Sequence, residues 1–330
     1  MKSASRIASL LLPLGTFLCG CELPHEMAMQ HVGTGQKALE ARQLDAALVE
    51  FQQAIRLDPQ LAEAHRELGM VYKEKGELEQ ATTSLETAVQ LDPRDFKAVF
   101  ELGEINKMLD RVTQAIRAYA MAFKLQPRNF EAAFRLAVCY HESGDLKQAE
   151  ETYKAALKID PHSAAVLSNL GALYDAAGTT YEAIKAYKQS LETNTNQPMV
   201  LVNLATAYMS LDRMTLAQRT LEAAIKMDPR CGMAYERLGY CFWKLQKLDD
   251  AMRTYREAVE LDEKNARAYA GLGVVRMTQY VNDPKVTGYR DEAVEAWHRS
   301  LEIDANQPKL RELIEKYRPK SEAPTLTFER

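Results

Sequence analysis

The chain has 330 residues, of which 46% are hydrophobic and 27% are charged, and its formal net charge is −4 at pH 7. These values are typical of folded, soluble proteins and argue against a disordered chain and against a membrane-spanning one. The slight negative charge and the lack of any run of five or six like charges argue against a nucleic-acid binder.

The first twenty residues have the pattern of an export signal. Lys2 and Arg6 precede an apolar run over 7–18, which is too short to cross a bilayer as a helix. The run ends in the sequence Leu-Cys-Gly-Cys at 18–21, which resembles the bacterial lipobox. Residues 1–20 are therefore predicted to be a signal peptide, and Cys21 is predicted to carry the lipid.

The alternative is an ordinary signal peptide with a chance cysteine. Cys19 is the poorer lipid acceptor because Phe17 and Leu18 before it are too large for the cleavage site. Residues 21–27 would form a short lipidated linker. Glu22 directly follows Cys21. In enterobacterial lipoproteins, an aspartate at this position resembles an inner-membrane retention signal. We therefore expect an exported, lipid-anchored protein, by default on the outer membrane facing the periplasm, although inner versus outer membrane stays open.

From Ala28 to Asn265 the chain aligns with itself at a period of 34 residues without an insertion. Position 20 of each period is alanine, position 24 is large and position 27 is small. Positions seven and eight are leucine and a small residue: Leu68-Gly69, Leu102-Gly103, Leu136-Ala137, Leu170-Gly171, Leu204-Ala205, Leu238-Gly239 and Leu272-Gly273. Most periods close with a proline, which ends the second predicted helix: Pro59, Pro93, Pro127, Pro161 and Pro229.

This pattern resembles that of the tetratricopeptide repeat (TPR) family over about four-fifths of the chain. The small residues at positions eight and 20 predict a close crossing of two antiparallel helices. The predicted fold is all-α, a right-handed α-solenoid of about eight TPR hairpins with a C-terminal capping helix. The predicted repeats are 28–61, 62–95, 96–129, 130–163, 164–197, 198–231, 232–265 and 266–307.

The eighth repeat departs from the pattern, because the alanine expected at position 20 arrives late, at Ala293. We predict an insertion of about eight residues over 281–289, with a loop marked by the sequence Asn-Asp-Pro at 282–284 and by Gly288. A tolerated insertion is favoured over a functional lip. Residues 308–317 are predicted to form the capping helix, and residues 318–330 are predicted to be a disordered tail.

No residue pattern points to catalysis or to a cofactor. Cys139 and Cys241 stand at a core-facing position of their helices, and Cys231 stands too far from Cys241 for a disulfide, so all three are predicted to be buried thiols. The histidines fall in different repeats without the spacing of metal ligands. We therefore predict a protein that is not an enzyme and that binds no metal.

The TPR resemblance implies a concave face lined by the first helix of each repeat. Repeats two and three offer mainly charge on that face. Asn169 and Asn203 stand at position six of adjacent repeats, and this short row is similar to the asparagine row in the repeats of O-GlcNAc transferase; Arg237 follows in the same row. The predicted partner-binding residues are Asn169, Asn203, Arg237, Tyr240, Trp243, Met209, Phe134 and Arg135. The alternative is that these side chains only make an inner surface soluble.

The sequence therefore predicts a non-catalytic scaffold that holds a protein or an extended peptide at a membrane, similar in plan to pilotins or to adaptors of cell-wall hydrolases. One alternative is a targeting module related to the repeats of O-GlcNAc transferase, without the catalytic domain. Another is a self-associating scaffold. The identity of the partner and the oligomeric state stay open.

Overall fold

The computed structural model describes residues 22–318. The predicted signal peptide, the predicted lipid acceptor Cys21 and residues 319–330 of the predicted tail lie outside the described residues. The described part of the chain contains 17 α-helices and no strand. The predicted all-α fold is confirmed.

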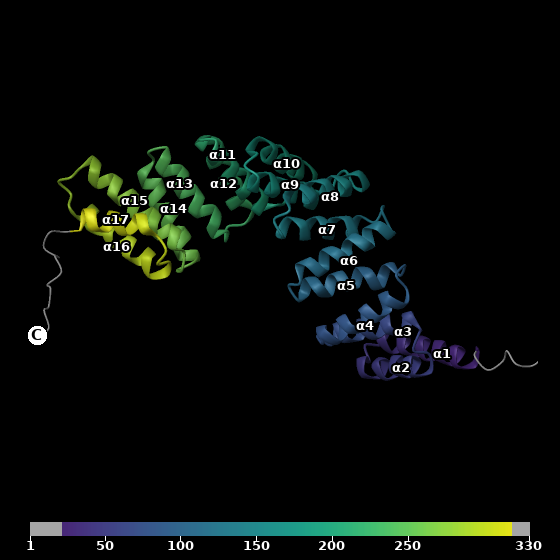
Figure 1. The fold of residues 1–330 in the computed structure, drawn as a ribbon. Coiled ribbons are helices and arrows are strands. Elements are labelled where there is room, and N and C mark those ends of the chain that lie inside the picture. Colours follow the sequence, from purple (N-terminus) through teal and green to yellow (C-terminus); the bar gives the residue numbers. More distant parts are fainter. Residues whose placement is uncertain (1–21, 319–330) are drawn as a thin grey trace, which may run out of the picture. The chain divides into compact units, whose positions relative to one another are not determined.

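The helices follow one another as antiparallel pairs (Figure 1). Their bounds are α1 Glu22–Glu40, α2 Leu44–Leu57, α3 Ala62–Glu74, α4 Leu78–Leu91, α5 Phe96–Met108, α6 Val112–Leu125, α7 Phe130–Glu142, α8 Leu146–Ile159, α9 Ala164–Ala176, α10 Thr180–Thr193, α11 Pro198–Ser210, α12 Met214–Met227, α13 Gly232–Lys244, α14 Leu248–Leu261, α15 Ala266–Asn282, α16 Gly288–Ile303 and α17 Pro308–Tyr317.

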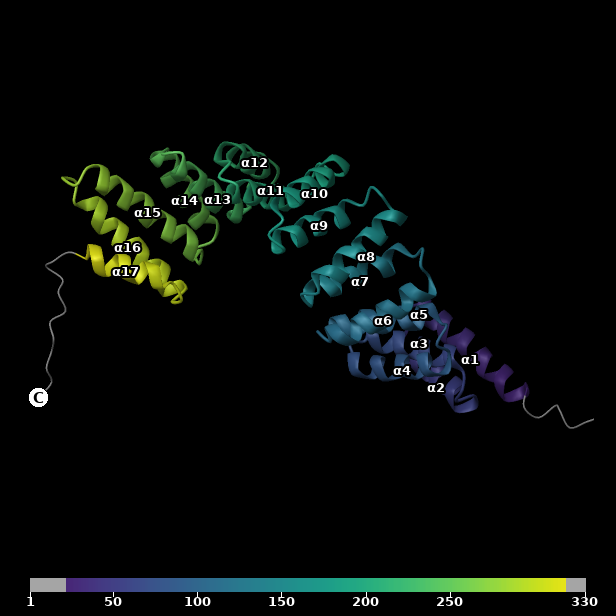
Figure 2. The same ribbon diagram turned by 45° about the horizontal axis from the view of Figure 1, so that its top comes forward.

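The chain divides into two compact units, of which the first ends at Thr152 and the second begins at Tyr153, both within α8. In unit 1 the pairs α1–α2, α3–α4 and α5–α6 form hairpins, and the second helix of each hairpin packs on the next first helix. Unit 2 repeats this plan from α9 to α16, and α17 packs on α16 (Figure 1, Figure 2). Each unit is a stack of helical hairpins, and α17 is the predicted capping helix.

Several helices begin at a residue whose side chain accepts a hydrogen bond from the first turn. The acceptors stand at position 34 of their repeats, and the bonds run from Ala98 N to Asp95 (3.2 Å), from Ala132 N to Asn129 (3.0 Å), from Val166 N to Ser163 (3.4 Å) and from Ala268 N to Asn265 (2.9 Å). These side chains satisfy amide groups that have no partner within the helix. The same position therefore starts a helix in successive repeats.

At the helix crossing predicted from positions eight and 20, the side chain that packs against position eight comes from position 24. A Cβ atom added at Gly171 would lie 2.5 Å from the ring of Tyr187, and one added at Gly103 would lie 2.7 Å from the ring of Tyr119. The side chain at position 24 therefore covers the residue at position eight, whereas the alanine at 20 contributes backbone. The carbonyl oxygen of Ala81, for example, would lie 3.3 Å from a Cβ atom at Gly69.

The turn between the two helices uses a left-handed residue at position 15 of the repeat. In the described chain the backbone φ at this position is positive at Arg42, Gly76, Asp110, Gly144, Gly178, Asp212 and Gln246. Four of these seven residues carry a side chain, although the left-handed conformation favours glycine. The turn geometry is thus imposed by the packing of the hairpin and not by glycine alone.

Two hairpins end at the sequence Asn-Gln-Pro, at 196–198 and 306–308. The Nε2 of Gln197 donates hydrogen bonds to the carbonyl oxygens of Ser190 (3.0 Å) and Asn194 (2.7 Å), which lie at the C-terminal end of α10. Gln307 does the same for Ser300 (3.2 Å) and Asp304 (2.9 Å) after α16. Each glutamine satisfies carbonyls that the helix leaves without partners, and the proline after it begins the next helix.

The insertion in the eighth repeat lengthens both helices instead of forming a long loop. Residues 281–282 belong to α15 and residues 288–289 belong to α16, so the connection is only 283–287. The guanidinium of Arg276 lies 5.2 Å from the ring centre of Tyr289, and its Nε lies 2.6 Å from Glu292 Oε2. These contacts hold the added turns together, which explains why the predicted loop is shorter than expected.

The three cysteines of the described chain are buried and unbonded, as predicted. Burial raises the pKa of the Cys139 thiol to about 11 and that of the Cys241 thiol to about 12. Both thiols are therefore protonated at neutral pH and contribute to packing as small apolar groups.

Candidate functional site

A groove of about 750 Å³ opens in unit 2 between first helices of successive repeats. Met209 of α11 lines it together with Arg237, Tyr240 and Trp243 of α13. Residues of α14, α15 and α17 complete the lining, and we call this space the α13 groove. The structure thus brings together four of the predicted partner-binding residues.

The other four predicted residues lie elsewhere. Asn169 on α9 and Asn203 on α11 are half-buried in unit 2, outside the lining of the groove, and neither amide makes a hydrogen bond among the residues that the structure describes. Phe134 on α7 stacks on Phe130, with ring centres 5.9 Å apart. Arg135, also in unit 1, is held by the carboxylates of two neighbours, Glu131 at 2.7 Å and Glu104 at 3.3 Å.

Seven lining residues were not predicted from the sequence: Glu236, Tyr255, Arg267, Ala270, Gly271, Val274 and Lys309. Arg267 and Val274 stand at positions two and nine of the eighth repeat, which are concave positions in the TPR pattern. Extending that pattern into the irregular repeat would have identified both. The Lys309 side chain could not have been placed, because it comes from the capping helix.

Aromatic rings form the apolar side of the α13 groove. The ring centres of Tyr240 and Trp243 lie 5.6 Å apart, and both side chains are half-buried. Trp243 Nε1 donates a hydrogen bond of 3.0 Å to Thr278 Oγ1 on α15, which fixes the indole between two first helices. Fixed, partly exposed aromatic side chains are typical of protein interaction surfaces.

The floor of the groove depends on the absence of a side chain at Gly271. A Cβ atom there would lie 2.3 Å from Cζ of Tyr255, so the Tyr255 ring occupies this space. Tyr119 and Tyr187 stand at the same repeat position as Tyr255, and their hydroxyls donate hydrogen bonds to Glu104 and Asp175. The Tyr255 hydroxyl makes no hydrogen bond within residues 22–318 and is available to a ligand. Burial and the charge of Glu236 raise the pKa of Tyr255, so the hydroxyl is a donor at neutral pH.

Charged groups surround the apolar surface. Arg237, Arg267 and Lys309 line the groove, and none of them forms an ion pair in the described part of the chain. Arg237 Nη1 donates to Thr206 Oγ1, while its buried Nε has no hydrogen-bond partner among the described residues. Glu236 is the one carboxylate among the lining residues. Burial raises the pKa of Glu236, and the charges of Arg267 and Arg237 oppose that shift.

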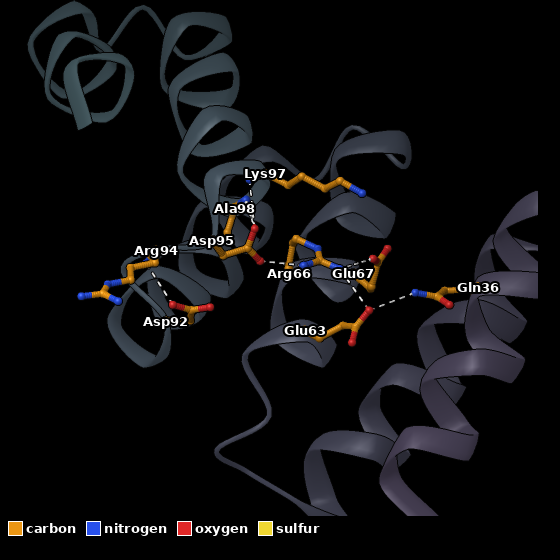
Figure 3. A network of polar contacts seen from close by, with 9 residues as sticks. All are labelled: Gln36, Glu63, Arg66, Glu67, Asp92, Arg94, Asp95, Lys97 and Ala98. Atoms are coloured by element: carbon orange, nitrogen blue, oxygen red, sulfur yellow. Dashed lines mark hydrogen bonds and ion pairs between the residues drawn. The ribbon is translucent and has the colours of Figure 1, made fainter. Parts of the chain in front are cut away.

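The first helices of unit 1 present charges that are already paired. Arg66 Nη1 lies 2.6 Å from Asp95 Oδ2, and Arg66 Nη2 lies 2.8 Å from Glu67 Oε1 and 3.2 Å from Glu63 Oε1 (Figure 3). Gln36 on α1 donates to Glu63 at 3.3 Å. A cavity of about 740 Å³ beside this network is lined in part by the same paired charges. The network joins α1, α3 and α5 and leaves fewer free groups for a ligand than the α13 groove.

Replacing Arg66 by alanine is expected to lower the free energy of unfolding of unit 1 by about 1–3 kcal/mol, because three carboxylates lose their common partner. The Arg66 side chain is only 15% exposed, so solvent screens these pairs weakly. Urea unfolding followed by circular dichroism would measure the loss. Arg253→Ala is the matched control, because its side chain is 71% exposed and its pair with Asp250 should contribute little. Equal losses in the two variants would contradict a structural role of the network.

Within residues 22–318, no group of three or more His, Cys, Asp or Glu residues is placed to hold a metal ion. None of the described helices is long and apolar enough to cross a membrane.

The chain is similar to several solved protein structures. A TPR protein from Parabacteroides merdae is 20% identical with a TM-score of 0.59, and the match covers 78% of this chain and 98% of that one. PilF of Pseudomonas aeruginosa is 20% identical with a TM-score of 0.56, and the match covers 68% of this chain and 100% of that one. The protein MamA is 28% identical with a TM-score of 0.49, over 52% of this chain and 93% of that one.

A comparison with curated proteins finds no match. Family models do match: a model described as tetratricopeptide repeat matches residues 109–164, 143–198 and 202–278, and one described as TPR repeat matches residues 39–76 and 69–110. These matches run over 39–198 and 202–278, where the 34-residue period and the helical hairpins were found. The chain belongs to the tetratricopeptide repeat family.

Proposed function

We propose that the protein is a non-catalytic scaffold that holds an extended segment of a partner protein in the α13 groove. The observation that carries this proposal is the combination of an apolar ring surface with polar groups that have no partner within the described chain. The Tyr255 hydroxyl and the Glu236 carboxylate belong to this set. Polar groups without partners are costly to bury, so a ligand that satisfies them gains affinity.

An extended peptide suits this arrangement better than a small rigid ligand. Glu236 can accept a hydrogen bond from a peptide N–H, and the Tyr255 hydroxyl can donate to a peptide carbonyl. Asn203 stands on α11 at the repeat position that Arg237 occupies on α13, and Asn169 stands at the same position on α9. An amide both donates and accepts, so these two side chains can extend the contact along the backbone of the same segment without reading its sequence.

The proposal includes export and a lipid anchor at Cys21, which rest on the sequence pattern of residues 1–21 alone. The predicted linker is wrong in the structure, because α1 begins at Glu22 and residues 22–27 belong to this helix. With α1 directly after Cys21, the first repeat would stay close to the membrane surface. A scaffold in that position could hold one component of an envelope assembly, in the manner of a pilotin or of an adaptor for a cell-wall hydrolase.

Site-specific photo-crosslinking tests the groove. A photoreactive phenylalanine analogue in place of Tyr240 is expected to give an adduct with one partner protein in envelope extracts. The same analogue at Tyr181 of α10, which is 65% exposed and lies outside the groove, is the control. A second change, Trp243→Ala, is expected to lower the adduct yield at position 240 by about tenfold or more, as for an interface hot spot.

Equal adducts at positions 240 and 181 would contradict the assignment of the groove. An adduct of twice the mass of the chain would instead identify a second copy as the occupant and would favour self-association.

A further inference from the structure

We infer that the α13 groove selects segments in which a carboxylate lies beside an apolar side chain. This inference rests on the proposed function and adds the chemistry of the ligand to it. The occupant to which it commits is a segment of another protein, and the arguments are the charges around the groove and the shape of its floor.

The first argument is charge complementarity. Three cations line the groove, from α13, α15 and α17, against the single carboxylate of Glu236. In unit 1 most cations of the first helices are paired, because Arg66, Lys73, Lys107 and Arg135 all have carboxylate partners, whereas Lys97 beside the cavity of unit 1 forms no ion pair among the described residues. Surface cations are usually paired when a carboxylate stands within reach, and pairing lowers their attraction for a ligand. The cations of the α13 groove remain available to a ligand carboxylate.

The second argument is the position of these cations relative to the apolar surface. Arg267 and Gly271 lie one helical turn apart on α15, so a charged side chain stands next to the place where the largely buried Tyr255 ring lines the groove. Val274 lies on the same face of α15, toward Trp243. The Trp243 indole is held to α15 by its hydrogen bond to Thr278. A ligand whose apolar side chain rests on Trp243 and Tyr255 therefore places its neighbouring residue close to Arg267.

Methionines make the apolar contact adaptable. Met209 lines the groove, and Met233 is 42% exposed and lies 3.5 Å, through its Sδ, from Arg237 Nη2. Flexible methionine side chains tolerate apolar ligands of different shape. The carboxylate would then supply most of the discrimination, whereas the identity of the apolar residue would matter less.

Tryptophan fluorescence tests this inference on the full chain. The protein has two tryptophans; Trp297 is 1% exposed, so a ligand in the groove changes the emission of Trp243 only. The probes are Gly-Ser peptides with Phe-Asp, Phe-Asn or Gly-Asp at the centre and an amidated C-terminus. A fourth peptide has Phe-Asn at its end with a free carboxylate. Trp243→Phe should abolish the signal.

The Phe-Asp peptide is expected to bind about tenfold more tightly than the amidated Phe-Asn peptide. Arg267→Ala should reduce this ratio to about threefold or less, and Glu236→Gln should increase it, because one change removes an attractive charge and the other a repulsive one. Arg253→Ala keeps the ratio and serves as the charge control. If the peptide with the free terminal carboxylate binds like Phe-Asp, the groove accepts a carboxylate from either source, which supports the inference.

Equal binding of both amidated Phe peptides would overturn the inference and leave the proposed function in place. If no peptide changes the emission of Trp243, while the crosslink at position 240 still forms, the chemistry of the ligand is again wrong but the site stands. A truncated variant that ends at Arg318 tests whether the chain itself fills the groove. If this variant binds the Phe-Asp peptide more tightly than the full chain does, the segment Phe328-Glu329 competes for the groove, and the choice of a partner protein is overturned. A change of emission on dilution of the protein alone would overturn it in favour of a second copy.

Discussion

Replacing Trp297 by alanine is expected to lower the free energy of unfolding of the last hairpin and its cap by about 3–5 kcal/mol. Trp297 is 1% exposed and is among the largest fully buried side chains of the described residues. Its indole lies against Gly273, where an added Cβ atom would be 2.3 Å from Nε1, and Nε1 donates to the carbonyl oxygen of Ala270 at 3.2 Å. Alanine would leave a cavity between α15, α16 and α17 and would remove the hydrogen bond from the indole to the Ala270 carbonyl oxygen.

Hydrogen exchange of the amides of α15, α16 and α17 is the suitable measurement, because a repeat array can unfold from its end while the rest stays folded. Protection in these three helices should fall, whereas protection in α9–α12 should change little. Tyr181→Ala is the control, since this side chain is 65% exposed and its removal creates no cavity. Unchanged protection in α17 would mean that Leu310 and Ile314, and not Trp297, hold the cap.

The fold was largely predictable because one chemical pattern recurs at a fixed distance. Glycine or alanine at position eight, alanine at 20 and a large residue at 24 define the hairpin in each period, and proline or a capping side chain marks its ends. The contact partner of position eight was not predictable. Alanine at 20 and the large side chain at 24 lie one turn apart on the same helix, so only coordinates tell which of them covers the glycine.

The turn at position 15 shows a limit of reading turns from residue type. Glycine stands there in three hairpins, but Arg42 and Gln246 adopt the same left-handed backbone, with φ of 58° in both. The cost of about 1–2 kcal/mol for such a residue is small beside the packing of two helices. Residues 281–289 show the same limit: the sequence Asn-Asp-Pro marked a loop correctly, but the contacts of Arg276 with Tyr289 and Glu292 shortened it.

The candidate site could be predicted only where it follows the repeat. Arg237, Tyr240 and Trp243 were found from their positions on a first helix. Tyr255 and Lys309 were missed for two reasons: a ring at position 24 reaches the groove only because Gly271 has no side chain, and the direction of the capping helix is not encoded in the 34-residue period. Arg135 was chosen by position alone, and its carboxylate partners from α5 and α7 could not be seen in the sequence.

Replacing Cys21 by alanine is expected to release the protein from membranes almost completely. The proposed lipid would be attached at this residue, so the substitution removes the proposed anchor. Stable anchoring takes more than one acyl chain, and a lipoprotein cysteine that carries several chains satisfies this requirement. Fractionation of cells into membrane and soluble material, followed by mass determination of the N-terminal peptide, measures both the anchor and its chemistry.

Cys19→Ala is the matched control, because it removes a neighbouring thiol of the same apolar run and leaves the proposed acceptor in place. This variant should sediment with membranes like the unchanged protein, and its N-terminal peptide should still begin with a lipidated Cys21. If instead both variants sediment, membrane association comes from the folded repeats or from a bound partner, and the lipid anchor is wrong. If Cys19→Ala alone is released, the acceptor is Cys19, because the large residues Phe17 and Leu18 do not exclude cleavage.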